Sequence, residues 1–189
     1  MRIGIDLDGV LFDSDRLFDA YAELFDIECN GTGRQNDAVH VEEAYCWSEE
    51  HFNKFLNTYF YTKILNEAPI NFLGKEIIKK LQNNGHELFV ITNRGSINQK
   101  EKELTLNRLE KENLKFDKTI FAIGSKTPVC KENHIDIMIE NSPSIVEELA
   151  NNGIKCIYFR DNTKPILAPN VFTAKNWAEV YRIIKNQAK

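Results

Sequence analysis

The sequence predicts an α/β protein with a doubly wound parallel sheet, into which a small helical module is inserted after the first strand. Two observations carry this prediction. From about residue 74 onward, short apolar runs alternate with segments of helical periodicity, which is the pattern of a parallel sheet with helical connections. The apolar runs are rich in isoleucine, valine and phenylalanine, as is typical of strands that are covered on both faces.

Six segments have the character of strands. The expected ranges are 2–8, 86–93, 119–124, 134–141, 154–160 and 170–174. Helical patterns at 75–85, 98–114 and 142–153 lie between them, and two of these patterns end at a glycine, a residue that readily ends a helix. Helical connections are what parallel pairing of successive strands requires.

The segment between the first strand and the alternating part contains no convincing strand. Residues 16–27 and 48–65 carry apolar side chains at helical spacing, so we expect a helical cap module over 14–70 and an α/β core over 1–13 and 71–189. Eleven of the twenty aromatic residues lie between Phe12 and Tyr61. A small bundle that needs bulky side chains for its core is the favoured interpretation over a ligand-stacking surface, although both can hold.

The composition argues against several classes of protein. With a net charge of −4 and no basic stripe, the chain does not resemble a binder of nucleic acid polymers. Its four cysteines are widely spaced and form no CxxC pair, which argues against a zinc or redox site and favours a reduced, cytoplasmic setting. No apolar run is long enough for a membrane span, and a strand that begins at residue 2 leaves no room for a signal peptide. A homodimer through the sheet edge or the cap is compatible with the sequence.

Polar side chains follow four of the expected strands. The carboxyl ends of parallel strands meet at one edge of the sheet, where ligands bind in such folds. Taken singly, each polar residue has an ordinary explanation as a turn, a helix cap or a surface residue. Together they bring two carboxylates, a hydroxyl, an ammonium and a third carboxylate to one rim. The residues are Asp6 and Asp8, Thr92 and Asn93, Lys126, and Glu140 and Asn141.

The first pair of acids, Asp6 and Asp8 in the stretch IGIDLDGV, is the most telling of these groups. In an extended strand, residues two apart point to the same side, so the two carboxylates come together unless the strand breaks between them. Like charges repel and lose hydration at the end of a buried strand, so the pair needs a cation or a chemical task. A divalent cation that prefers oxygen ligands, such as Mg²⁺, suits this pair.

The order DLDGV, ITNR, a lysine and an acidic residue after the fourth strand resembles that of the haloacid dehalogenase-like phosphohydrolases, over the whole chain. Within that superfamily, residues 68–94 and the small helical module are similar to the cytosolic 5′(3′)-deoxyribonucleotidases and their bacterial nucleotidase-like relatives. The resemblance implies a Mg²⁺-dependent phosphatase whose substrate is a small phosphomonoester, most specifically a nucleoside monophosphate. The alternatives are a phosphatase of sugar phosphates or other metabolites, a phosphotransferase, and a non-catalytic nucleotide-binding protein on the same fold.

The resemblance also implies roles for individual residues. Asp6 is implied as the nucleophile that forms an aspartyl-phosphate, and Asp8 as the general acid and then the general base. Thr92, with the backbone amide of Asn93, is implied to hold the phosphoryl oxygens, and Lys126 to neutralise the charge shared by nucleophile and phosphate.

The metal ligands implied by the resemblance are Asp6, the backbone carbonyl of Asp8, and the pair at the end of the fourth strand. The family usually has two aspartates there, whereas this chain has Glu140 and Asn141, so one negative charge is lost. Either residue is therefore a candidate for the direct ligand of Mg²⁺. The amide of Gly9, where the chain turns away, can also face an anion.

Three further residues are candidates for substrate binding. Arg94 follows the second strand and can contact a phosphate or sugar, and a solvent-facing loop residue is the equal alternative. Tyr45 and Trp47 lie in the linker of the cap and can stack on a nucleobase when the cap closes. His40 lies in the same linker and is a fourth, less favoured candidate.

Overall fold

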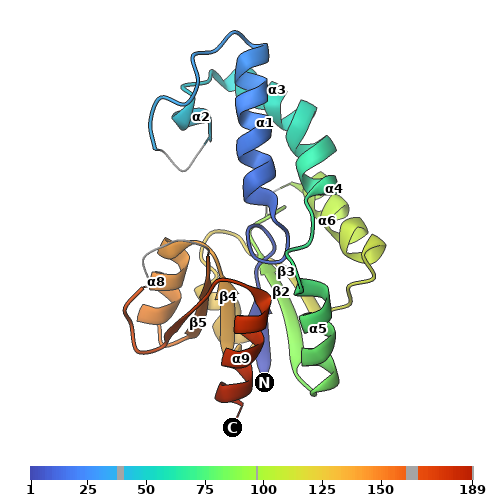
Figure 1. Cartoon of the computed structure of the whole chain (residues 1–189), viewed down its shortest axis with the longest axis vertical. Helices are drawn as coiled ribbons and strands as arrows, with labels where there is room; N and C mark the ends of the chain where they lie inside the picture. Colours follow the sequence, from blue (N-terminus) through green and yellow to red (C-terminus); the bar gives the residue numbers. More distant parts are fainter. Residues whose placement is uncertain (38–40, 97, 161–165, 189) are drawn as a thin grey trace. The chain divides into compact units, whose positions relative to one another are not determined.

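The structure of the chain is a computed structural model that describes residues 1–37, 41–96, 98–160 and 166–188 (Figure 1). The chain divides into two compact units. One, the core unit, comprises Met1–Asp13 and Ile70–Lys189, and the other, the insert unit, comprises Ser14–Pro69. Each unit has its own hydrophobic interior, and the two are described separately below.

The core unit contains one six-stranded sheet in which every pair of neighbours is parallel. The strand order is β3-β2-β1-β4-β5-β6, which is the order of a doubly wound fold. The fold class expected from the sequence is therefore confirmed, and each expected strand corresponds to one strand of the sheet. The bounds are β1 (Arg2–Ile5), β2 (Glu87–Thr92), β3 (Lys118–Phe121), β4 (Ile137–Glu140), β5 (Lys155–Phe159) and β6 (Val171–Ala174).

Five helices of the core unit are described: α5 (Gly74–Asn83), α6 (Gln99–Lys111), α7 (Thr127–Glu132), α8 (Pro143–Asn151) and α9 (Trp177–Gln187). The sequence patterns located α5, α6 and α8 but neither α7 nor α9. Helix α7 has only six residues, too few to show a helical period. Helix α9 does carry a signal, because its buried residues Trp177, Val180 and Ile184 recur at helical spacing.

Helices cover both faces of the sheet. On one face, side chains of α7 and α8 such as Cys130, Val146 and Leu149 pack with Met138 and Cys156 of the strands. Helices α5 and α9 pack against each other and lie side by side in front of the sheet in Figure 1. Strands β1, β2 and β4 are consequently buried almost throughout, which explains why their sequences are nearly continuous apolar runs.

The insert unit is helical, as expected. It contains α1 (Ser14–Glu28), α2 (Val41–Ala44), α3 (Glu49–Phe55), the π-helical segment η1 (Leu56–Ile64) and α4 (Leu65–Glu67). Its interior is aromatic: the ring of Phe25 lies 5.6 Å from that of Phe55 and 5.0 Å from that of Trp47, in edge-to-face arrangements. The cluster of aromatic residues in this part of the sequence therefore forms the core of a small bundle.

Two further findings concern the expected setting of the protein. Among the described residues, no helix is both long and apolar enough to cross a membrane. The four cysteines, Cys29, Cys46, Cys130 and Cys156, are all free thiols.

Candidate active site

Asp6 and Asp8 follow the end of β1 and lie at the carboxyl edge of the sheet. Strand β1 ends at Ile5, earlier than expected, although the amide of Asp6 still donates to the carbonyl of Ile139 at 3.0 Å. The chain then turns tightly, because the amides of residues 10–12 all donate to the carbonyl of Leu7. Gly9 has φ +68 within this turn, a left-handed conformation that favours glycine. The turn separates Asp8 from the strand and lets it point to its own partner.

A cavity of about 220 Å³, lined mainly by residues with polar or charged side chains, lies at this edge of the sheet. Eight of the residues that line it are site residues expected from the sequence, so the structure brings these together from four separate strand ends. Two lining residues, Ser142 and Ile145, were not expected, and only their position directly after the fourth strand could have indicated them. The complete lining is Asp6, Asp8, Thr92, Asn93, Arg94, Lys126, Glu140, Asn141, Ser142 and Ile145.

Lys126 lies between two carboxylates at the bottom of the site. Its Nζ is 2.9 Å from Oδ1 of Asp6 and 2.6 Å from Oε2 of Glu140. The side chains of Lys126 and Glu140 are only 1% exposed. Burial opposes the charged form, but the two carboxylates dominate and raise the pKa of Lys126, so the ammonium is a permanent positive charge.

Glu140 uses both of its carboxylate oxygens within the protein. While Oε2 contacts Lys126, Oε1 accepts the backbone amides of Asn141 and Ser142, each at 2.9 Å. Oε1 therefore has no lone pair left for a metal ion, and Oε2 has one, in a side chain that is only 1% exposed. The arrangement therefore gives Glu140 the task of orienting Lys126, and leaves Asn141, which is partly exposed at the cavity, in the better position for a ligand.

The carboxyl group of Asp6 is poorly compensated in this setting. Burial is the main cause that raises its pKa, to about 7; Glu140 and Asp8 raise it further, and Lys126 opposes the shift. The cavity contains the carboxylates of Asp6, Asp8 and Glu140 against the cations of Lys126 and Arg94. The site thus has an excess of one negative charge, which a divalent cation would compensate.

The raised pKa of Asp6 predicts that the stability of the fold depends on pH. Because the pKa of Asp6 is raised in the folded state, the folded chain binds the proton more tightly than the unfolded chain, and stability falls as the pH rises between about 4 and 7. Asp6→Asn removes the charge, so we expect this variant to be more stable than the wild type by about 2 kcal/mol at pH 8 in EDTA. At pH 4.5 the gain should be close to zero. Urea unfolding at both pH values measures the difference, and an equal gain at both would contradict the explanation.

Asp8 and Arg94 form a second ion pair beside the first. Nε of Arg94 is 3.0 Å from Oδ2 of Asp8, and Nη2 contacts Oδ1. The guanidinium therefore binds the carboxylate in a bidentate manner, through two parallel N–H groups. The arginine side chain is only 1% exposed, so the interpretation of Arg94 as a solvent-facing loop residue is wrong. Its sequence position in a loop hid this, because the loop folds back onto Phe12, whose ring lies 5.5 Å from the guanidinium carbon. The two close aspartates thus each have their own basic partner.

The end of β2 provides hydrogen-bonding groups between these two ion pairs. The hydroxyl of Thr92 is buried and accepts the amide of Arg94 at 3.1 Å, which leaves its own proton for another acceptor. The side-chain amide of Asn93 donates to the carbonyl of Gly124 at 2.7 Å. This bond ties the loop after β2 to the loop after β3, so both loops are held at one edge of the cavity.

The loop that carries Lys126 is fixed by a carboxylate of α8. Ser125 and Thr127, on either side of the lysine, both donate their hydroxyls to Oε1 of Glu148, with a distance of 2.7 Å for Thr127. These hydrogen bonds lower the pKa of Glu148. No short motif links residues so far apart in the chain, so these contacts of Glu148 could not be predicted from the sequence.

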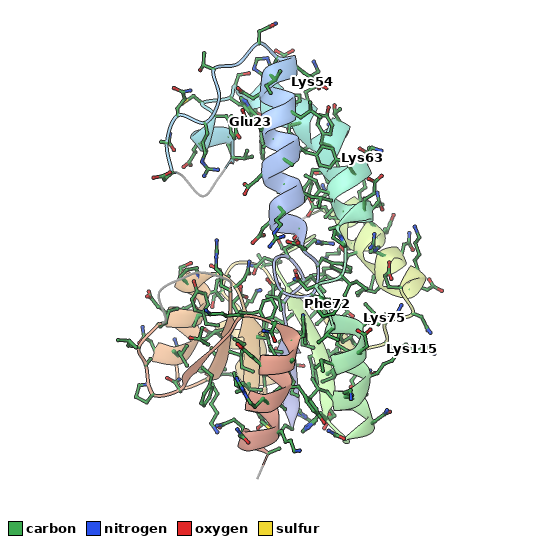
Figure 2. The ribbon with its side chains drawn as sticks, in the orientation of Figure 1. Glu23, Lys54, Lys63, Phe72, Lys75 and Lys115 are labelled. Atoms are coloured by element: carbon green, nitrogen blue, oxygen red, sulfur yellow. The ribbon has the colours of Figure 1, made fainter. Side chains whose placement is uncertain are left out.

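The remaining candidates, Tyr45 and Trp47, belong to the insert unit and pack inside it. Their rings are stacked on each other with centroids 5.1 Å apart. The hydroxyl of Tyr45 donates to Glu23, which Figure 2 labels on α1. The indole N–H of Trp47 donates to Asp26 at 2.7 Å. Both side chains thus serve the interior of this unit, where Tyr45 is buried and its pKa is raised to about 12 by burial and by Glu23. His40 lies outside the described residues.

The donor set of the cavity fits Mg²⁺ in chemistry. Carboxylate oxygens of Asp6 and Asp8 and the side chain of Asn141 line the same space, and magnesium commonly takes one or two carboxylates and completes its shell with water. Among the described residues, no three His, Cys, Asp or Glu side chains already converge on a common point. The reason is visible in the structure, because Asp6 and Glu140 converge on the ammonium of Lys126 instead.

Comparisons with known proteins bear on the fold. No family model matches the sequence, and no curated protein matches it. Among solved structures, a predicted phosphatase from Clostridium acetobutylicum is 16% identical, with a TM-score of 0.71 and 98% of each chain covered. A putative beta-phosphoglucomutase from Thermotoga maritima is 18% identical, with a TM-score of 0.69 and 98% of each chain covered. A haloacid dehalogenase-like hydrolase from Streptococcus pneumoniae is 16% identical, with a TM-score of 0.65 and 97% of each chain covered. Over nearly its whole length, the chain therefore has the fold of the haloacid dehalogenase-like hydrolases.

Proposed function

We propose that the chain is a phosphomonoesterase that hydrolyses small phosphomonoesters through an aspartyl-phosphate on Asp6. The observation that carries the proposal is the cavity at the carboxyl end of β1. There the buried carboxylate of Asp6 lies 2.9 Å from the ammonium of Lys126, and a second carboxylate follows two residues later. A nucleophile, a fixed cation and a group for proton transfer are the parts that phosphoryl transfer requires.

In the first half of the reaction, a carboxylate oxygen of Asp6 attacks phosphorus and the bond from phosphorus to the ester oxygen breaks. For this step Asp8 must be protonated; it donates that proton to the departing oxygen, which leaves as an alcohol, and Asp8 becomes a carboxylate. Lys126 counters the negative charge shared by Asp6 and the phosphoryl group, and the hydroxyl of Thr92 and the amide of Asn93 bind phosphoryl oxygens. In the second half, water attacks the same phosphorus, Asp8 takes its proton, and Asp6 is released with inorganic phosphate.

Mg²⁺ is the proposed cofactor. Three groups would hold the ion: the carboxylate of Asp6, the backbone carbonyl of Asp8 and the side chain of Asn141. Glu140 would not bind the ion directly and would instead orient Lys126. When bound, the ion would neutralise charge on the phosphate and compensate the negative excess of the cavity. The raised pKa of Asp6 fits this assignment, since burial disfavours the charged carboxylate and a bound cation would offset that cost.

Nucleoside monophosphates are the proposed substrate class, on the resemblance of residues 68–94 to deoxyribonucleotidases. Small sugar or organic-acid phosphates are a second candidate, and two observations favour them. One neighbouring structure is a putative beta-phosphoglucomutase, and another, from Haemophilus somnus, is a predicted phosphoglycolate phosphatase that is 17% identical with a TM-score of 0.64. In addition, the rings of Tyr45 and Trp47 are stacked on each other within the insert unit, which weakens the case for a base-stacking surface made by these two residues.

A substrate panel tests both the activity and the class. We expect phosphate release from nucleoside monophosphates, in Mg²⁺ buffer, to exceed release from sugar phosphates and 2-phosphoglycolate, and EDTA to reduce all of it to the background. Release that is restricted to sugar or acid phosphates would keep the chemistry and replace the substrate class. If no phosphomonoester in the panel is hydrolysed by folded protein with Mg²⁺, the proposed activity is wrong.

A further inference from the structure

The two members of the ion pair between Arg94 and Asp8 differ greatly in burial. The side chain of Asp8 is 40% exposed, whereas that of Arg94 is 1% exposed. Two parallel N–H groups of the guanidinium meet the two carboxylate oxygens, and such a fork sets the plane of the carboxylate as well as its position. The buried arginine is therefore the rigid member of the pair, and it determines where the more exposed carboxylate lies.

Several contacts hold Arg94 and its loop in place. Its guanidinium lies over the ring of Phe12, and its amide donates to the hydroxyl of Thr92. The next residue, Gly95, donates its amide to Oε2 of Glu101 in α6 at 2.7 Å. A side chain at Gly95 would lie 2.9 Å from the backbone nitrogen of Lys102, so the loop approaches α6 as closely as glycine allows. The backbone from which the Arg94 side chain extends is therefore anchored on both sides.

We propose that Arg94 is a positioning residue for the second half of the reaction, in which it holds Asp8 as an oriented carboxylate. This inference rests on the proposed function. In the step concerned, the oxygen of water forms a bond to phosphorus and the bond from phosphorus to Asp6 breaks. The proton of the water passes to a carboxylate oxygen of Asp8, and Asp6 recovers its carboxylate. A carboxylate that accepts two N–H groups is ionised and can therefore take up this proton. The two N–H groups of Arg94 also fix the orientation of the carboxylate.

Kinetics with p-nitrophenyl phosphate isolate this step, because the nitrophenolate leaves without needing a proton. Arg94→Lys keeps the charge but loses the fork. We expect kcat to fall by about 100-fold, within the range of a lost general base. KM should fall with it, so that kcat/KM, which reports formation of the aspartyl-phosphate, changes less than about threefold. Rapid mixing should reveal a burst approaching one nitrophenolate per active site, larger than the burst of the wild type.

Arg108→Lys is a matched control. The guanidinium of Arg108 in α6 also lies over the ring of Phe12, at 5.3 Å, and the side chain is also buried. Its ion-pair partner is Glu112, the residue directly after α6. If loss of packing on Phe12 were the cause, both variants would behave alike. We expect the control to show no enlarged burst. Glu101→Gln, which weakens the anchor of Gly95 and keeps Arg94, is a second test variant and should enlarge the burst to a smaller extent.

Two results would overturn the inference while leaving the proposed function intact. One is a rise of KM in Arg94→Lys with kcat unchanged and no burst, which would make Arg94 a substrate-binding residue. The other is an equal loss of kcat and kcat/KM without a burst in both Arg94→Lys and Glu101→Gln. If the wild-type chain itself released neither nitrophenolate nor phosphate, the proposed function would fall, and this inference with it.

Discussion

Asp6→Asn is expected to abolish phosphate release from every substrate, with a fall in kcat on the order of 1,000-fold or more. The amide of asparagine is a much weaker nucleophile than a carboxylate, so the aspartyl-phosphate cannot form. The shape of the site should persist, because asparagine has the same size and can still meet the ammonium of Lys126. The fold should be at least as stable as that of the wild type above pH 7, for the reason given above.

Asp136→Asn is the control for this variant. Asp136 lies just before β4, at the opposite edge of the sheet, and its carboxylate accepts the amide of Arg2 at 2.7 Å. We expect this substitution to leave kcat within about twofold of the wild type, because it is remote from the cavity. Steady-state phosphate release of the two variants, measured side by side, decides the matter. Substantial turnover by folded Asp6→Asn would show that another group is the nucleophile.

The sequence was sufficient for the architecture because the relevant signals are local. Apolar runs with a strand period, separated by helical patterns, locate the six strands and the helices α5, α6 and α8. The carboxyl-edge rule for parallel sheets then groups Asp6, Thr92 and Lys126 at one rim, and no contact between distant residues has to be known.

The sequence was not sufficient for the electrostatics of the site, which depend on long-range contacts. The partner of Asp8 is Arg94, 86 residues away, and nothing in the segment ITNR indicates that the arginine is buried. Similarly, Glu140 looks like an open metal ligand until its bonds to Lys126 and to two backbone amides are seen. The identity of a charged group can be predicted from a motif, whereas its partner depends on how the loops between strands fold.

The second large effect is expected for Lys126→Met, and it should appear in stability as well as activity. This substitution leaves the carboxylates of Asp6 and Glu140 buried side by side without their shared cation. Removal of one member of a buried ion pair typically costs about 3–5 kcal/mol, so we expect a loss of this size at pH 8. The loss should shrink at pH 5, where Asp6, whose pKa is raised, can take up a proton. Urea unfolding measures the loss. Lys131→Met is the control with little expected change, because Lys131 is an exposed lysine of α7, the helix that begins directly after Lys126, and its Nζ contacts Asn152.

A double variant separates the two tasks of Lys126. In Lys126→Met/Glu140→Gln, one buried charge is removed together with the cation, so most of the lost stability should return. Activity should not return, because the positive charge that counters the phosphoryl group in the transition state is still missing. A double variant that regained both would reduce Lys126 to a structural counter-ion of Glu140. A double variant that regained stability but not activity would give the ammonium of Lys126 a role in catalysis and Glu140 the role of holding it in place. The 2.6 Å contact between these two fully buried side chains favours this result.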